Sequence, residues 1–200
     1  MNPSTKTRPP ERGETDVCHG LGPVVKVVGM GDGIRKKAKR DAERLLRITG
    51  NVGVAVEPAG IANRLGVQVL KGNLREESLG GLLMTPGEDP EIVLNQRDGL
   101  IRRRLTCAYE LGHFVLRSAD MNDYSRVDLR GQKPAAEETP EEIYAKEFAA
   151  CLLMPEDVVR TLAELGMDDL EMAVWLVVSR EAMQLRLSSL SLVTIDLRVA

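Results

Sequence analysis

Apolar residues recur every three or four positions in several segments of the chain, and this spacing predicts amphipathic helices. The first such segment covers 34–48 and ends before Gly50, which suits a helix stop. A second, shorter helix is expected between Pro58, which suits a first helical turn, and Gly66, which suits an end. Each helix has one apolar face, so both are expected to pack against a common core.

Three brief apolar segments follow, at 67–70, 80–84 and 92–95, and turn-forming residues separate them. Their length and these turn formers predict the strands of a small sheet. A three-stranded sheet cannot bury its own faces, so helices must cover it. These segments therefore predict a small sheet covered by helices.

A longer helix is predicted over about 98–116, because small and apolar residues mark one stripe along it: Ile101, Leu105, Ala108, Gly112 and Val115. On the adjoining face, Tyr109 lies one helical turn before His113. The spacing alone favours an ordinary buried helix with one satisfied histidine and an ion-paired Glu110.

A further helix has a complete set of start signals. Thr139 suits the N-cap, Pro140 the first helical position and Glu142 the far end of a capping box. The polar stretch 117–138 before it is expected to be a loop, and Pro155 marks its end. The capping box gives Glu142 an ordinary structural role, with which any ligand role competes.

After a helix near 156–165, residues 168–192 resemble the apolar skeleton of a helix-turn-helix, with helices expected at 169–176 and 179–190. The second helix is expected to expose a thin set of side chains for DNA recognition: Arg180, Glu181, Gln184 and Arg186. A structural helix pair is therefore favoured over a DNA-reading pair. Trp175 is expected in the core.

The 200 residues are 43% hydrophobic and 28% charged, which suits one domain, expected over 34–200 after a flexible extension at 1–33. The net charge of -3 argues against a surface built for nucleic acid. The helix over 34–48 has a basic face, but Asp41 and Glu43 interrupt it. A solvated face is therefore favoured over a phosphate-binding one.

Cysteine usage indicates a reducing compartment. Cys18, Cys107 and Cys151 are odd in number and widely spaced, and no C-x-x-C pair occurs. Cys107 and Cys151 are expected to be small buried apolar residues. The apolar run 24–30 is short and interrupted by Lys26, which suits neither a signal peptide nor a membrane span. The expected location is the cytoplasm.

Residues 104–113 contain the motif that bears most on function: Arg-Leu-Thr-Cys-Ala-Tyr-Glu-Leu-Gly-His. It matches the zinc-peptidase pattern H-E-x-x-H except that Tyr109 replaces the first histidine, while Glu110 and His113 are kept. The one other histidine is His19. An imidazole-rich zinc site therefore cannot be assembled from one chain.

Together, residues 104–113 and 145–155 resemble the ImmA/IrrE family of metallo-endopeptidases. The family's two blocks usually read R-x-T-x-A-H-E-L-G-H and E-x-x-A-N-x-F-A-A-x-L-L-M-P, and the likeness spans roughly 34–192. The resemblance implies a zincin-like α+β domain in which two histidines and a downstream glutamate hold zinc and the motif glutamate activates a bound water. It also implies that the protein acts on a Xre/Cro-type transcriptional repressor in a bacterial or phage regulatory system.

By this resemblance, Glu110 matches the general base, and His113 and Glu142 match zinc ligands. Tyr109 takes the place of the first histidine, and Lys146 that of the asparagine. A neutral phenol is a poor zinc ligand, and ionising it at pH 7 costs about 4 kcal/mol. Because catalytic zinc normally has three protein ligands, the zinc site is expected to be weakened or lost.

Several alternatives stay open. Lys146 follows Glu142 by one helical turn, so its ammonium could replace the charge of the zinc, leaving an inactive pseudoprotease that binds a repressor or another protein. Zinc could instead be kept by an anionic Tyr109 or by His19, and Tyr109 could be an introduced substitution. A helix-turn-helix regulator that binds DNA is the least favoured alternative, so neither DNA nor a membrane is an expected partner.

Overall fold

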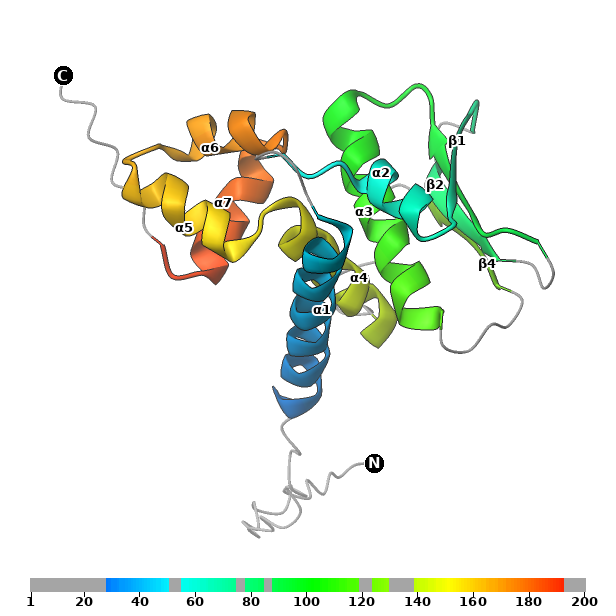
Figure 1. Ribbon diagram of the computed structural model, residues 1–200, viewed down its shortest axis with the longest axis horizontal. Coiled ribbons are helices and arrows are strands. Elements are labelled where there is room, and N and C mark those ends of the chain that lie inside the picture. Colours follow the sequence, from blue (N-terminus) through cyan, green and yellow to red (C-terminus); the bar gives the residue numbers. More distant parts are fainter. Residues whose placement is uncertain are drawn as a thin grey trace, which may run out of the picture.

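The computed structural model describes residues 28–50, 55–74, 78–84, 88–118, 124–129 and 139–192. One part of the molecule packs helices on a small sheet, and a cluster of later helices lies beside it (Figure 1). This cluster consists of α5 (Glu156–Glu164), α6 (Asp169–Leu176) and α7 (Arg180–Ser189). The arrangement confirms the expected α+β class.

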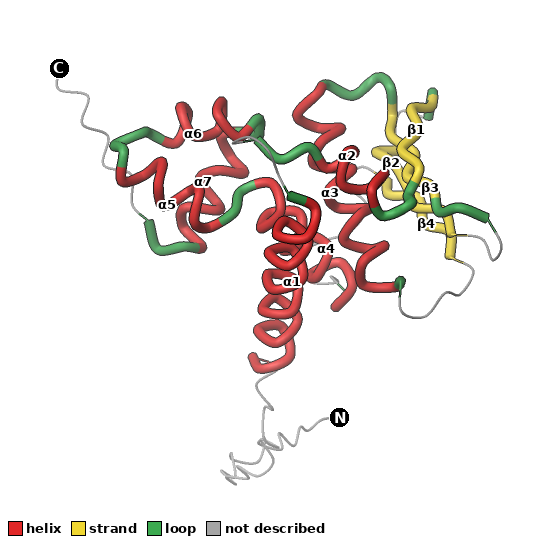
Figure 2. The backbone as a smooth tube through the Cα atoms, viewed as in Figure 1, coloured by secondary structure: helices red, strands yellow, loops and turns green. Residues whose placement is uncertain are grey.

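The part with the sheet is built in layers. Figure 2 shows the sheet at one side of the molecule, then α3 (Leu100–Arg117), then α4 (Pro140–Leu153) with α1 (Val28–Thr49) against it. The short helix α2 (Pro58–Arg64) packs on α3 and begins with proline, as predicted. Within the described residues, α3 is therefore covered on both sides, by the sheet and by α4.

α1 is longer than the sequence suggests, because it begins at Val28 rather than at residue 34. Its end before Gly50 is as predicted, and Gly50 has a φ of 59°, a conformation that glycine adopts without steric cost. Its apolar face is buried through Ala38, Ala42 and Leu45. The remainder of the predicted extension, including Cys18 and His19, lies outside the described residues.

The described strands form one sheet in the order β1-β3-β2-β4. β1 (Gln68–Gly72) pairs in parallel with β3 (Glu91–Asn95), and β2 (Ser78–Met84) pairs antiparallel with both β3 and β4 (Tyr124–Leu129). The first three strands match the predicted segments. β4 lies in the stretch expected to be a loop, so that expectation was wrong there. An edge strand rich in polar residues lacks the apolar signal of a central strand.

Two glycines allow α3 to approach the elements on both sides of it. An added Cβ at Gly80 of β2 would lie 2.6 Å from Cγ2 of Thr106, and an added Cβ at Gly112 would lie 3.1 Å from Cα of Ala145 in α4. Both distances are shorter than ordinary carbon contacts. Because these two glycines have no side chain, the sheet, α3 and α4 can pack this closely together.

The predicted core stripe of α3 is buried only in its later half. Ala108 and Gly112 are buried, but Ile101 is 44% exposed and Leu105 is also exposed. Figure 1 shows that α4 lies along the later half of α3 and leaves its first turns uncovered. The expectation that Ile101 and Leu105 belong to the core was therefore wrong, because spacing does not reveal how far a neighbouring helix extends.

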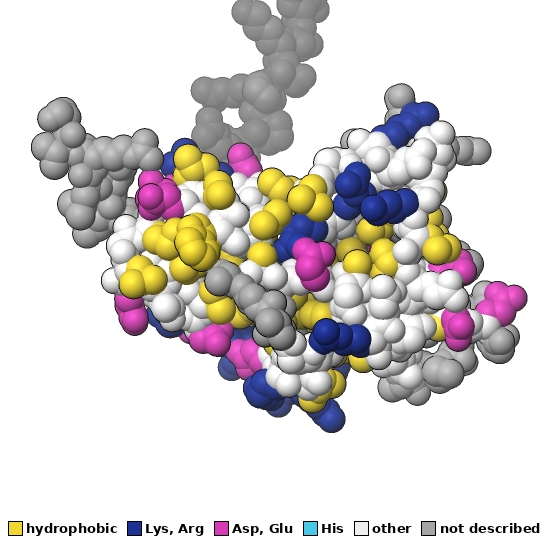
Figure 3. Space-filling model, turned by 45° about the horizontal axis from the view of Figure 1, so that its top comes forward, with side chains coloured by type: hydrophobic (Ala, Val, Ile, Leu, Met, Phe, Trp, Pro, Cys, Tyr) yellow, Lys and Arg dark blue, Asp and Glu magenta, His cyan; other side chains and the backbone are white. Residues whose placement is uncertain are grey.

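The cluster of α5, α6 and α7 has its own buried side chains, among them Met172, Leu176, Met183 and Leu187. Trp175 is not one of them: it is 54% exposed on α6, and Val174 beside it is exposed as well. The prediction of a core tryptophan was therefore wrong. Figure 3 shows hydrophobic side chains gathered on the surface of this helical cluster.

Candidate functional site

The motif residues of α3 lie on one side of that helix. The rings of Tyr109 and His113 meet edge to face, with centroids 4.8 Å apart and planes at 86°. Glu110 and His113 are 0% exposed, and Tyr109 is half-buried. The helical spacing thus brings the residue in the place of the first histidine directly against the second histidine, as the sequence predicts.

α4 meets α3 beside these residues. Gly112 adjoins the backbone of Ala145, which follows Glu142 by one helical turn, and His113 is the next residue of α3. Glu142 is buried. The contact between the two helices therefore places the turn of α3 that carries His113 next to the turn of α4 that carries Glu142.

The predicted capping box is present at the start of α4. The backbone N–H of Thr139 donates to Oε2 of Glu142 at 3.2 Å, and the N–H of Glu142 donates to Oγ1 of Thr139 at 3.3 Å. One oxygen of the Glu142 carboxylate is thus used to begin the helix. The ordinary structural role that the sequence suggested for this residue is confirmed.

Lys146 lies one turn further along α4, and its side chain is exposed. Glu110, by contrast, is enclosed completely. Water screens an exposed ammonium, so such a group compensates a buried carboxylate less than a bound metal ion does. The idea that Lys146 replaces the charge of zinc stays a prediction.

The donors near this site do not fit a three-ligand zinc centre. Tyr109 offers a phenol, which is neutral near pH 7 unless a metal or a base removes its proton. Among the described residues, no group of three or more His, Cys, Asp and Glu is arranged to hold a metal ion. Only His113 and Glu142 supply good zinc donors at the predicted positions.

The two described cysteines are poor candidates for chemistry. Burial raises the pKa of Cys107 to about 12, and the nearby charge of Glu110 contributes to the rise. Burial likewise raises the pKa of Cys151 to about 11. Both thiols are therefore protonated at neutral pH, which makes them weak ligands and nucleophiles. Their expected role as buried apolar residues is confirmed.

Arg104, the first residue of the motif block, is a buried anchor. Its Nη2 donates to the carbonyl oxygen of Val56 at 2.6 Å and to that of Leu176 at 3.5 Å, and its Nε donates to the carbonyl of Val177 at 3.3 Å. The guanidinium also pairs with Glu57. Arg104 thus ties α3 to the segment before α2 and to the end of α6.

Two of the four residues that were expected to read DNA, Arg180 and Gln184, instead hold α7 against α6. Nε and Nη2 of Arg180 donate to the Asp169 carboxylate at 2.9 and 3.0 Å, and Gln184 donates to it at 2.6 Å. These bonds, led by that from Arg180, hold the pKa of Asp169 at about 2. The expected exposure of Arg186 was wrong, because it is buried and its Nε donates to the Met154 carbonyl at 3.0 Å.

Sequence reasoning missed this function of Arg186 because the partners come from other helices. A cation at an outward-looking helical position is ordinarily solvated, and the spacing within α7 does not show that the end of α4 lies above it. One weak sequence signal points to the burial of Arg186: the apolar residues Met183 and Leu187 lie close to it on the same helix.

No described helix combines the length and the apolar character that crossing a bilayer requires.

A solved structure described as a Mycobacterium tuberculosis transcriptional regulator is similar, with a TM-score of 0.54 at 18% identity. The match covers 80% of this chain and 51% of that chain, so this chain spans about half the length of that structure. No curated protein matches the chain.

The family comparison agrees with the two motif blocks. A family model described as Peptidase M78, IrrE N-terminal-like domain, matches residues 62–188, which is more than half of the chain. The matched range contains Tyr109, Glu110, His113, Glu142 and Lys146. The chain therefore belongs to the IrrE N-terminal-like family.

Proposed function

We propose that this chain is a regulatory protein that binds a Xre/Cro-type transcriptional repressor through a peptidase scaffold whose zinc centre is weakened beyond catalytic use. The observation that carries the proposal is the contact between Tyr109 and His113, whose ring centroids are 4.8 Å apart. Tyr109 occupies the place of a zinc-binding imidazole and fills it with a phenol ring. Family membership supports the regulatory role.

Ligand chemistry supports the loss of the metal. A neutral imidazole offers a lone pair at pH 7, whereas a phenol must first lose a proton at a cost of about 4 kcal/mol. His113 and Glu142 are left as two good donors, one fewer than catalytic zinc sites normally have. An oxygen of Glu142 also accepts the N–H of Thr139, which binding to a metal would have to share or displace.

The surface supports a protein partner. α6 exposes Leu170, Val174 and Trp175, and exposed apolar groups close together on a helix are characteristic of protein-binding surfaces. Aromatic side chains such as that of Trp175 commonly contribute much of the binding energy at protein interfaces. This face does not depend on the zinc site, so binding can persist where cleavage is lost.

The test measures zinc, cleavage and binding on one preparation. The protein is purified from zinc-supplemented medium, its zinc content is measured by elemental analysis, and it is incubated with a tryptophan-free repressor of this class. We expect substoichiometric zinc, an intact repressor and a complex that shifts the fluorescence of Trp175, the sole tryptophan, to shorter wavelength. One tightly held zinc per chain together with repressor cleavage would overturn the proposal.

A further inference from the structure

Four cations of α1 lie on the side of the helix that faces away from its buried residues. Lys36, Arg40, Arg44 and Arg47 are spaced four, four and three residues apart, so they lie on one side of the helix. All four side chains are exposed, and the buried Ala38, Ala42 and Leu45 lie on the opposite side. We call these four cations the α1 stripe. The residues matched by the family model begin at 62, so α1 lies outside them.

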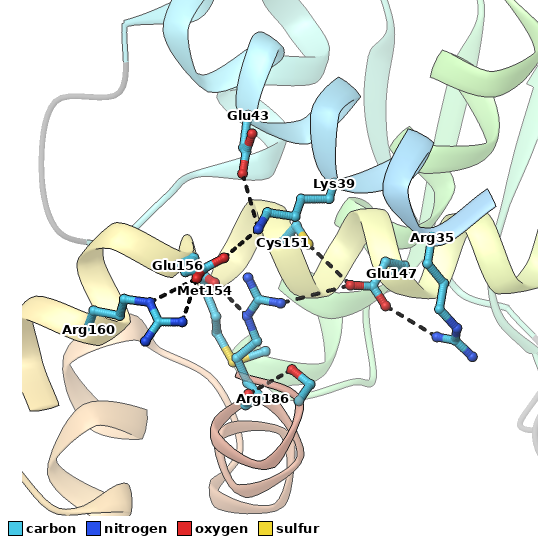
Figure 4. A network of polar contacts seen from close by, with 10 residues as sticks. Arg35, Lys39, Glu43, Glu147, Cys151, Met154, Glu156, Arg160 and Arg186 are labelled. Carbon is cyan, nitrogen blue, oxygen red and sulfur yellow. Dashed lines mark hydrogen bonds and ion pairs between the residues drawn. The ribbon is translucent and has the colours of Figure 1, made fainter. Parts of the chain in front are cut away.

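The other cations of α1 are paired. Nζ of Lys37 lies 2.8 Å from Oδ2 of Asp41, and Lys39 pairs with both Glu43 and Glu156. Figure 4 shows Arg35 and Lys39 reaching Glu147 of α4 and Glu156 of α5. These ion pairs hold α1 against the neighbouring helices.

The same pairs engage two of the three acidic residues of α1, and the third, Asp32, is exposed one helical turn before Lys36. Asp41 accepts a hydrogen bond from the hydroxyl of Tyr144 in α4 at 2.7 Å, in addition to that from Lys37. Glu43 lies on the same side of the helix as the α1 stripe, and its Oε1 is 3.9 Å from Nζ of Lys39, so the stripe keeps a net positive charge around this one carboxylate. In the sequence, Asp41 and Glu43 interrupt a basic face. In the folded protein both are engaged by other partners, and no residue that the structure describes forms an ion pair with the α1 stripe.

We propose that the α1 stripe binds the phosphate backbone of duplex nucleic acid without sequence preference. The stripe covers eleven helical steps, which is about 16 Å at 1.5 Å per residue. One strand of a duplex presents a phosphate about every 3.4 Å along its axis, so the stripe can follow about five phosphates. Three of its four residues are arginines, whose planar groups bind phosphate oxygens in pairs.

A membrane surface fits the α1 stripe less well. A helix that lies in a bilayer interface inserts its apolar face among the lipids. The apolar face of α1 is already buried, with Ala38 and Ala42 completely enclosed. An acidic protein surface also fits less well, because Ile48 is the one large apolar side chain that the described part of α1 exposes, whereas protein interfaces are usually built around clusters of such anchors.

Fluorescence anisotropy of a labelled, mixed-sequence duplex tests the proposal without any repressor, so its outcome is separate from that of the proposed function. Four phosphate contacts predict that log affinity falls with log salt concentration with a slope of about -3.6. The double variant Arg40→Gln/Arg44→Gln is expected to reduce the slope by about 2 and to weaken binding at low salt by about tenfold or more.

The matched control is Lys71→Gln/Arg102→Gln, which removes two exposed cations from β1 and α3. It is expected to keep the slope of the unmodified protein. The proposal is overturned if the unmodified protein does not bind the duplex at low salt, or if the two double variants lose binding equally. Binding to vesicles of anionic lipid in preference to the duplex also overturns it.

Discussion

The ring of Tyr109 stands edge-on to the ring of His113, with the centroids 4.8 Å apart. One turn of helix separates them, which is the spacing that two zinc-binding imidazoles would need. A tyrosine at the first position keeps a ring there, but a neutral phenol is a poorer zinc ligand than an imidazole. This ring contact is the basis of the proposal that the scaffold is kept while its metal chemistry is weakened.

Tyr109→His is expected to raise zinc affinity by more than about 100-fold, because even partners outside the metal's own ligands change affinity by about 10 to 100-fold. Isothermal titration with zinc measures the change. Tyr109→Phe, which removes only the hydroxyl, serves as the control and is expected to gain nothing. If Tyr109→His also fails to gain zinc affinity, position 109 is not the main defect, and Lys146 or the capping role of Glu142 becomes the better explanation.

Gly112→Ala is expected to destabilise the protein by about 1 to 2 kcal/mol, despite the better helix propensity of alanine. The new Cβ would lie 3.1 Å from Cα of Ala145, and the backbone of a packed helix cannot readily move away. Urea denaturation measures the difference. Gly33→Ala is the matched control in α1, because a Cβ there has no neighbour within 4 Å, and it should leave stability unchanged or raise it.

Arg104→Lys is expected to lower the free energy of unfolding by about 2 to 4 kcal/mol. Lysine cannot reproduce a planar group that reaches three carbonyl oxygens at once, and those of Val56 and Leu176 would lose their donors. Arg102→Lys, at an exposed position two residues earlier, is the control and should change little. Equal stability of the two variants would show that Arg104 is not an anchor.

Asp169→Asn is expected to cost about 1 kcal/mol at pH 7, a modest amount because half of the Arg180 side chain is exposed and water screens the pair. The pKa of Asp169 is lower in the folded protein than in the unfolded chain, so protonation favours unfolding. The stabilisation that the Asp169 carboxylate supplies is complete above about pH 4 and is lost as the pH falls through about 2.

Denaturant curves of the unmodified protein and of Asp169→Asn, taken across this pH range, measure that contribution. The two curves should converge at the acidic end. Asp89→Asn, at an exposed position before β3 and outside any helix, is the control and should follow the unmodified protein throughout. A constant gap between the curves of Asp169→Asn and the unmodified protein would refute the role of the carboxylate charge.

The sequence determined what depends on neighbours a few residues away. Helical spacing placed Tyr109 beside His113, and the capping box of Thr139 and Glu142 was readable from two residues three positions apart. The apolar patterns predicted a small sheet covered by helices, and the two motif blocks indicated the family that the comparison confirms, with its α+β class. These features are local because helical geometry itself sets the relative positions of the residues.

Tertiary structure decided which of these faces are covered and which charges are paired. Trp175 is exposed and Arg186 buried because neighbouring helices cover one side of α7 and leave one side of α6 open. Asp41 is engaged by Tyr144, a residue far away in the sequence, and so does not interrupt the α1 stripe. Burial and ion pairing depend on which segments meet in space, and the period of a single helix contains no information about its neighbours.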